Sequence, residues 1–269
     1  MDIVVFIKQV PSTPSIRIDR ERMSVIREGV ESIINPLDRL ALGAALDLCG
    51  KSGGRITVIT MGPPQSEEAL REALAAGADR AILLSDSRFA GSDTYSTSHV
   101  LARSISMLED KPDLIICGMQ TIDSDTGHIG PQIAEELDLP QVCGVNEIHI
   151  EQSGSLLVKR LSDGFLETIR LDPPVLITVG RGVSALGDIP LADIQEAFEM
   201  GSLEKWGAEE LGLSGDEVGL KGSPTKVRAL RMPDAAKKGE LVHGSPARLL
   251  DEVMRRLEEL GIVEEGPHE

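Results

Sequence analysis

The sequence predicts an α/β protein built on a doubly wound, mostly parallel sheet, with a small antiparallel meander, a C-terminal arm and a final helix. Short apolar runs alternate with helical patterns through the first half of the chain, which is typical of repeated parallel β-α units. The hydrophobic residues amount to 41% of the chain but the aromatic ones to only 2%. Such an aliphatic composition favours strands that are covered by helices on both faces.

The expected elements of the first half follow one another in regular alternation. The apolar runs predict strands at 2–8, 55–62, 81–84 and 113–118. Helices are expected from Pro36 to Gly53, over 65–76, from the segment 91–98 to near residue 108, and over 130–137. Pro36 fits the first helical turn, where its missing N–H would have no partner in any case. The polar stretch from Ser15 to Ile34 is compatible with a short ribbon.

The pattern changes near residue 145. Apolar residues then alternate with period two, and Asp163-Gly164 indicates a hairpin, so an antiparallel meander is expected over 145–180. A helix should follow near 190–199. The stretch 201–245 is rich in glycine and charge, and it predicts an arm lying on another subunit, followed by an amphipathic helix at 246–260. The expected division is therefore an α/β domain over 1–200 and an arm with its helix over 201–269.

Charge and cysteine usage exclude several classes of function. A net charge of −17 argues against binding nucleic acid or an anionic membrane surface. No apolar run is long enough for membrane insertion, and the N-terminus enters a strand at once, so no signal peptide is expected. Cys49, Cys117 and Cys143 are odd in number and widely spaced. They are expected to be reduced thiols of a cytoplasmic protein, and neither a metal site nor a catalytic nucleophile set is predicted.

The segment GMQTIDSDTGHIGPQ (118–132) is the candidate binding loop, because it follows a predicted strand directly. In doubly wound sheets, ligands bind at the carboxyl ends of the strands, where the strand order reverses. Ile7-Lys8-Gln9 and Met61-Gly62-Pro63 are expected at the same edge. A helix starting near 126–129 would direct its free N–H groups towards a phosphate.

Individual residues of this loop have the chemistry that a nucleotide requires. Thr126 and Gly127 are small enough to let the backbone approach a phosphate, and Asp123 and Asp125 could accept hydrogen bonds from ribose hydroxyls. The alternative for Asp125-Thr126 is an ordinary helix N-cap. No G-x-G-x-x-G or Walker loop is present. These residues by themselves favour a Rossmann-like, adenine-nucleotide-binding domain.

The segment 91–98 carries the same two alternatives. Either Asp93 or Thr94 caps the helix that follows, or the N-terminus of that helix holds a second phosphate.

Six segments, taken together and in order, resemble the β subunit of electron-transfer flavoproteins over nearly the whole chain. They are IKQVP (7–11), SIINPLD (32–38), ITMGPPQ (59–65), EALAAGADRAILLSD (72–86), MQTIDSDTGHIGPQIAE (119–135) and GLKGSPT (219–225). The resemblance implies an αβ heterodimer in which the α subunit carries an electron-shuttling FAD and the β subunit holds an adenine nucleotide. Its nucleotide-contacting positions correspond to Phe6, Asn35, Met61, Thr121, Ser124, Gly127, His128 and Ile129.

The resemblance also bears on which nucleotide is bound. In the ordinary branch of the family it is a structural AMP. In the electron-bifurcating branch it is a second FAD, which takes hydride from NADH and divides the electron pair between two acceptors, with ferredoxin or flavodoxin at low potential. DSRFAGSDTYSTS (86–98) resembles the bifurcating branch, where Asp93, Thr94 and Thr97 would hold the diphosphate. The chain itself would be an electron-carrier subunit, with the chemistry supplied by the flavin.

One segment departs from the family pattern. The family has Pro-Arg-Tyr before the loop that docks onto acyl-CoA dehydrogenase-type flavoenzymes, whereas this chain has Leu186-Gly187-Asp188. Leu191 matches the hydrophobic anchor of that loop, but the lysine-rich tract that follows it in ordinary members is replaced by residues 195–199. The alternative for Leu191 is packing within its own helix. A universal-stress-type nucleotide sensor is the second functional class, because it shares the doubly wound plan.

Overall fold

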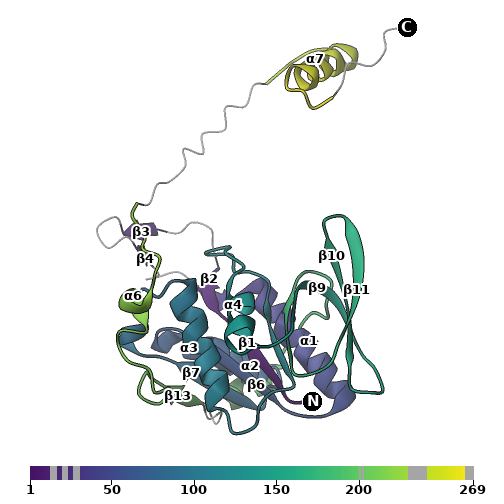
Figure 1. The fold of residues 1–269 in the computed structure, drawn as a ribbon. Helices are drawn as coiled ribbons and strands as arrows, with labels where there is room; N and C mark the ends of the chain where they lie inside the picture. Colours follow the sequence, from purple (N-terminus) through teal and green to yellow (C-terminus); the bar gives the residue numbers. More distant parts are fainter. Residues whose placement is uncertain are drawn as a thin grey trace. The chain divides into compact units, whose positions relative to one another are not determined.

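The computed structural model describes residues 1–12, 17–19, 24–26, 31–199, 201, 203–229 and 241–263. The chain divides into two units, Met1–Ala229 and Leu230–Glu269. Every described strand lies in the first unit, and helix α7 (Pro246–Glu259) lies in the second (Figure 1).

Nine of the described strands form one sheet in the order β11-β10-β9-β12-β8-β1-β6-β7-β13 (Figure 1). In the order of the sheet, β9, β12, β8, β1, β6, β7 and β13 each run parallel to the next strand. Strand β10 is antiparallel to both of its neighbours, β9 and β11. The strands are β1 (Ile3–Phe6), β6 (Ile56–Met61), β7 (Arg80–Leu84), β8 (Leu114–Gly118), β9 (Gln141–Ile150), β10 (Leu156–Ser162), β11 (Phe165–Leu171), β12 (Val175–Val179) and β13 (Glu204–Trp206). The predicted doubly wound sheet is confirmed, and an antiparallel meander is present in β9, β10 and β11. The expected range of 145–180 was too long, because β12 pairs in parallel with both β9 and β8.

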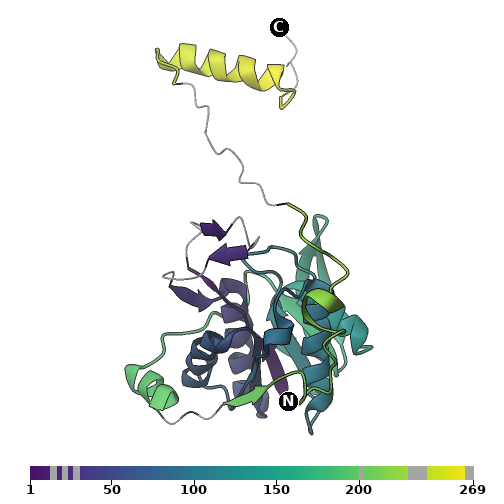
Figure 2. The same ribbon diagram turned by 90° about the vertical axis from the view of Figure 1, so that its left-hand side faces the viewer.

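The helices cover both faces of this sheet (Figures 1 and 2). They are α1 (Pro36–Ser52), α2 (Glu67–Ala75), α3 (Thr94–Met107), α4 (Ile129–Glu136), α5 (Leu191–Glu199) and α6 (Gly219–Gly222), with short 3-10 turns at Pro64–Ser66 and Ser87–Phe89. Helices α1 and α2 pack on one face together with Ile3 and Val5 of β1. Helices α3 and α4 pack on the other face with Val4 and Phe6. Because successive strand residues point to opposite faces, an uninterrupted apolar run serves both layers.

Two short ribbons and one tight hairpin complete the first unit. Strand β2 (Gln9–Pro11) pairs with β5 (Ser32–Ile34), and β3 (Arg17–Asp19) pairs with β4 (Ser24–Ile26). Asp163 and Gly164 both have positive φ, at 50° and 82°, and join β10 directly to β11. This is the two-residue hairpin turn that the Asp-Gly pair predicts.

The structure corrects the first half of the predicted arm. Strand β13 joins the edge of the main sheet beside β7, and Ala208, Leu211 and Val218 are buried in the core on the α3 side. These apolar residues are few, but all three pack in the core cluster between the sheet and α3. The glycine- and charge-rich composition of the segment gave no sign of this packing. The division between units therefore falls after Ala229, not at residue 200. Residues 230–240 lie outside the described residues, and α7 itself buries none of its residues.

The strand order reverses at β1, and Asp38 joins the two strand ends there. Its side chain is buried at 4% exposure; Oδ2 accepts the Lys8 N–H at 2.8 Å and Oδ1 accepts the Gly118 N–H at 3.0 Å. A Cβ at position 118 would lie 2.4 Å from that carboxylate oxygen, so only glycine fits. Burial raises the pKa of Asp38 to about 7, although the two N–H donors act to lower it.

We expect the stability of the fold to report the titration of Asp38. The folded-state pKa of about 7 lies above the ordinary value of 3.8, so the folded protein holds the proton of Asp38 more tightly than the unfolded chain does. The resulting contribution to the free energy of unfolding is fully present below pH 3.8 and is lost as the pH rises through about 7. The loss of stability in Asp38→Asn, measured by urea unfolding, should therefore be larger near about pH 5 than near about pH 8. Asp47→Asn, on the surface of the same helix, is the control for the loss of an acidic side chain from α1. An equal loss at both pH values in Asp38→Asn would contradict the assignment.

A second stability prediction concerns the two glycines inside α1. A Cβ at Gly43 would lie 2.6 Å from the Leu186 backbone nitrogen, whereas nothing lies within 4 Å of a Cβ at Gly50. Gly50→Ala should stabilise the protein by about 0.5–1 kcal/mol through helix propensity. Gly43→Ala should destabilise it by roughly 1–3 kcal/mol, since backbone must move. Thermal or urea unfolding of the pair measures both, and two changes of the same sign would refute this packing argument.

Candidate functional site

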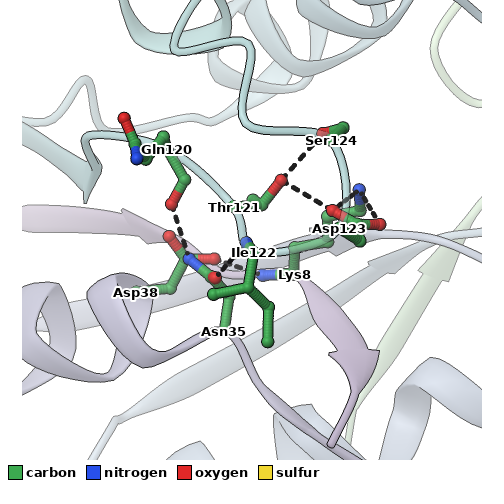
Figure 3. Close-up of polar contacts among 8 residues, drawn as sticks. All are labelled: Lys8, Asn35, Asp38, Gln120, Thr121, Ile122, Asp123 and Ser124. Carbon is green, nitrogen blue, oxygen red and sulfur yellow. Dashed lines mark hydrogen bonds and ion pairs between the residues drawn. The ribbon is translucent and has the colours of Figure 1, made fainter. Parts of the chain in front are cut away.

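The last residue of β8 and the loop that follows it lie at the point where the strand order reverses, and we call residues 118–128 the switch-point loop. Figure 3 shows Lys8, Asn35 and Asp38 directed towards it from the end of β1 and the start of α1. The Met119 N–H donates to the Val179 carbonyl at 2.9 Å, which places the loop's first residues against β12. Three neighbouring elements thus determine where the loop runs.

Asn35 fixes the middle of the loop. It occupies the N-cap position of α1 and is fully buried, but its side chain makes no cap hydrogen bond. Instead, Nδ2 donates to the Gln120 carbonyl at 3.0 Å and Oδ1 accepts the Ile122 N–H at 3.1 Å (Figure 3). Asparagine at this position ordinarily caps its own helix. Here both ends of the amide hold loop backbone, so α1 starts with a residue that serves the site.

Lys8 and Asp123 hold the next part of the loop against β1. The Lys8 Nζ lies 2.6 and 2.9 Å from the two Asp123 carboxylate oxygens. Thr121 Oγ1 donates to Asp123 at 2.7 Å and lies 2.9 Å from the Ser124 hydroxyl (Figure 3). Asp123 was expected to accept hydrogen bonds from a ribose. Its carboxylate is engaged within the protein, although a carboxylate has acceptor sites for more than two donors.

The last part of the loop leads into α4 without a side-chain cap. Asp125 and Gly127 have positive φ, at 53° and 66°, and the Asp125 N–H closes a turn on the Thr121 carbonyl at 2.9 Å. His128 is the N-cap residue of α4 and makes no side-chain cap bond. The alternative that Asp125-Thr126 caps this helix is therefore wrong. The N–H groups of Ile129 and Gly130 are free of a capping side chain, Pro131 has no N–H, and such a helix end suits an anion.

Helix α3 differs, because Asp93 does cap it. Its Oδ1 accepts the Ser96 N–H at 3.0 Å and its Oδ2 accepts the Thr225 N–H at 2.8 Å. Partial burial acts to raise the pKa of Asp93, but these hydrogen bonds outweigh it and the pKa is lowered. Thr94 and Thr97 lie in the first turn of α3 and are partly exposed. For Asp93 the structure thus forms the cap.

The remaining predicted residues lie in two places, at the strand ends beside the switch-point loop and on α5. Phe6 and Met61 end β1 and β6, at the same edge of the sheet as the switch-point loop. Leu191 begins α5 and is 80% exposed, so it does not pack within its own helix. Asp38 was missed by sequence reasoning. It stands in the quoted segment SIINPLD, but an acidic residue in a first helical turn gives no sign of being buried.

The described residues contain no group of three or more His, Cys, Asp or Glu side chains arranged to hold a metal ion. Within the same residues, none of the helices combines the length and the apolar character needed to cross a membrane.

Comparisons with known proteins agree with this architecture. The family model described as electron transfer flavoprotein domain matches residues 22–205. The electron transfer flavoprotein subunit beta of Thermoanaerobacterium thermosaccharolyticum is 43% identical over 263 residues, covering 98% of this chain and 100% of that relative. The caffeyl-CoA reductase-Etf complex subunit CarD of Acetobacterium woodii is 42% identical over 246 residues, covering 91% and 93%. Protein FixA of Sinorhizobium fredii is 42% identical over 240 residues, covering 87% and 84%. The chain therefore belongs to the electron transfer flavoprotein family, among its β subunits.

Proposed function

We propose that the chain binds FAD at the switch-point loop and takes part, with an electron transfer flavoprotein α subunit, in NADH-dependent electron bifurcation. The observation that carries the proposal is the loop itself, which Lys8, Asn35 and Asp38 hold in place beside the uncapped N-terminus of α4. A rigid loop next to free helix N–H groups is suited to an adenine nucleotide. In a chain of net charge −17, backbone N–H groups provide the positive potential that a phosphate requires.

FAD rather than AMP is favoured by the second helix end. The longer cofactor needs a place for its diphosphate, and α3 offers the hydroxyls of Thr94 and Thr97 in its first turn. Thr121, Ser124, Gly127, His128 and Ile129 are the proposed contacts of the AMP part of FAD, with its phosphate at the start of α4, while Phe6, Asn35 and Met61 shape the surroundings of that part. When bound, the flavin would supply the hydride and electron chemistry, and the protein would supply position and electrostatics.

Exposed apolar residues indicate where the partner proteins would bind. The second unit presents exposed Leu250, Val253 and Met254 on α7, and we assign this apolar stripe to the α subunit. Exposed Leu191 on α5 is the proposed anchor for an acyl-CoA dehydrogenase-type flavoenzyme. One relative is named as part of a caffeyl-CoA reductase complex, which supports this class of partner. Ferredoxin or flavodoxin would be the low-potential acceptor. Family membership removes the universal-stress-type alternative.

The nucleotide content of the purified heterodimer tests the proposal directly. Acid release followed by chromatography should give a second FAD beside that of the α subunit, and no AMP. NADH should then reduce the β-site flavin, as seen in its absorption spectrum. Release of AMP with a single FAD would show that the ordinary, non-bifurcating alternative is correct.

Breaking the Lys8–Asp123 pair should weaken the nucleotide. Asp123→Ala frees the loop from β1 and leaves Lys8 and Thr121 without this partner, a loss worth about 1–3 kcal/mol, or on the order of tenfold to a hundredfold in affinity. Titration of the nucleotide-stripped heterodimer with FAD measures the change. Asp47→Ala is the matched control, because Lys51 and Asp47 also form a 2.6 Å pair, but within α1 near its C-terminal end. If both variants bind FAD as the parent does, the pair does not shape the site.

A further inference from the structure

The segment Gly219–Thr225, which we call the clasp, is hydrogen-bonded to the N-terminal turn of α3. The Gly219 N–H donates to the Ser92 hydroxyl at 3.2 Å, and the Asp93 N–H donates to the Ser223 hydroxyl at 2.8 Å. The Thr225 N–H donates to the Asp93 carboxylate at 2.8 Å. Figure 1 shows α6, which forms the first part of the clasp, beside α3. The clasp is thus joined to a segment that lies far earlier in the chain, since 127 positions separate Gly219 from Ser92.

The fit of the clasp is close and specific. Gly219 has a φ of 63°, and a Cβ there would lie 2.0 Å from the Arg88 carbonyl oxygen, so another residue would force the backbones apart. Ser223 is buried at 4% exposure and also donates from its hydroxyl to the Gly219 carbonyl at 2.6 Å. A buried hydroxyl that bridges two backbone groups fixes both, because leaving either unpaired would cost free energy.

Asp93 is better suited to hold this clasp than to contact a phosphate. One carboxylate oxygen accepts from Ser96 in α3 and the other accepts from Thr225 in the clasp, so the side chain joins the two segments. A carboxylate placed directly against a phosphate would repel it. The neighbouring hydroxyls of Thr94 and Thr97 carry no charge and lie in the helical turn that Asp93 caps. The orientation of that turn consequently depends on both of the carboxylate's partners.

We propose that Asp93 is a positioning residue that couples cofactor binding at the first turn of α3 to the clasp, and so to the point where the chain leaves the first unit. The second unit begins at Leu230, five positions beyond Thr225. The coupling rests on the proposed function, because it requires the FAD diphosphate to bind at α3. Occupancy of the α3 turn stabilises the clasp, and a closed clasp raises the affinity for FAD by the same factor, since coupling free energy is reciprocal.

Two variants open the clasp from opposite sides. Asp93→Asn keeps a good N-cap residue, but an NH2 group replaces one of the two carboxylate oxygens and faces an N–H donor, either that of Ser96 or that of Thr225. Ser223→Ala removes the hydroxyl that accepts the Asp93 N–H, and this change leaves every side chain of α3 intact. Both variants are prepared as heterodimers with the α subunit, stripped of β-site nucleotide and titrated with FAD. Amide hydrogen exchange over 219–229 is followed with and without FAD.

In the parent, FAD should slow exchange over 219–229. Both variants should exchange faster there without FAD and bind FAD more weakly, each by on the order of tenfold, and FAD should protect the segment less than in the parent. Asp79→Asn is the control: its carboxylate likewise joins separate segments by accepting the Ile56 N–H at 2.7 Å, but at the opposite edge of the sheet. It should change neither FAD affinity nor exchange over 219–229.

Two different results would overturn the coupling. If the variants exchange faster but bind FAD as tightly as the parent, Asp93 only holds the fold together. If FAD binds the parent without slowing exchange over 219–229, the clasp does not sense the cofactor. Failure of the parent to bind FAD while it binds AMP would overturn the proposed function first, and the coupling with it, and is recognised from the parent alone.

Discussion

The structure depends on the way two parallel strands are held together where the strand order reverses. Strands β1 and β8 are neighbours, but the chain leaves their carboxyl ends in different directions, so the backbone groups beyond them need another partner. The Asp38 carboxylate supplies it by accepting an N–H from each side. Burial favours the protonated carboxyl and raises the pKa of Asp38, whereas the two N–H donors favour the carboxylate and act to lower it. Burial has the larger effect, and the pKa is about 7.

The first turn of α1 extends this constraint to the switch-point loop. Asn35 and Asp38 both occupy positions from which polar side chains ordinarily serve their own helix, and both are directed elsewhere. Proline at the first helical position helps to make this tolerable, because it has no N–H to satisfy and its fixed φ favours the helix. Asn35 makes no side-chain cap bond to the N–H groups of Leu37 or Asp38. Its amide and the Asp38 carboxylate, both buried, instead order residues 118–122. Lys8 then continues the same restraint as far as Asp123.

The two helix ends at this edge of the sheet are chemically different. Helix α4 presents N–H groups without a capping side chain, whereas α3 is capped by a carboxylate that also holds the clasp. An anion approaching α4 meets backbone dipoles, while at α3 it meets hydroxyls next to a charge that is already hydrogen-bonded on both oxygens. Lys8, a cation that contacts the loop, is itself paired with Asp123. Binding of a phosphate to such a site would rely on oriented dipoles more than on net charge.

The sequence alone determined the features that depend on local pattern. The alternation of strands and helices, the start of α1 at Pro36, the Asp-Gly hairpin and the loop between β8 and α4 all follow from neighbouring residues, and all are found. Only the tertiary structure decided which polar residues become buried and what they hold. Asp38 contacts Gly118 across 80 positions, Asn35 reaches Gln120 across 85, and Asp93 reaches Thr225 across 132. The same holds for β13, whose three residues become a strand only because the edge of β7 offers unpaired backbone groups. Long-range hydrogen bonds leave no periodic signal in the chain, since each partner is an ordinary polar residue until the fold brings the other beside it.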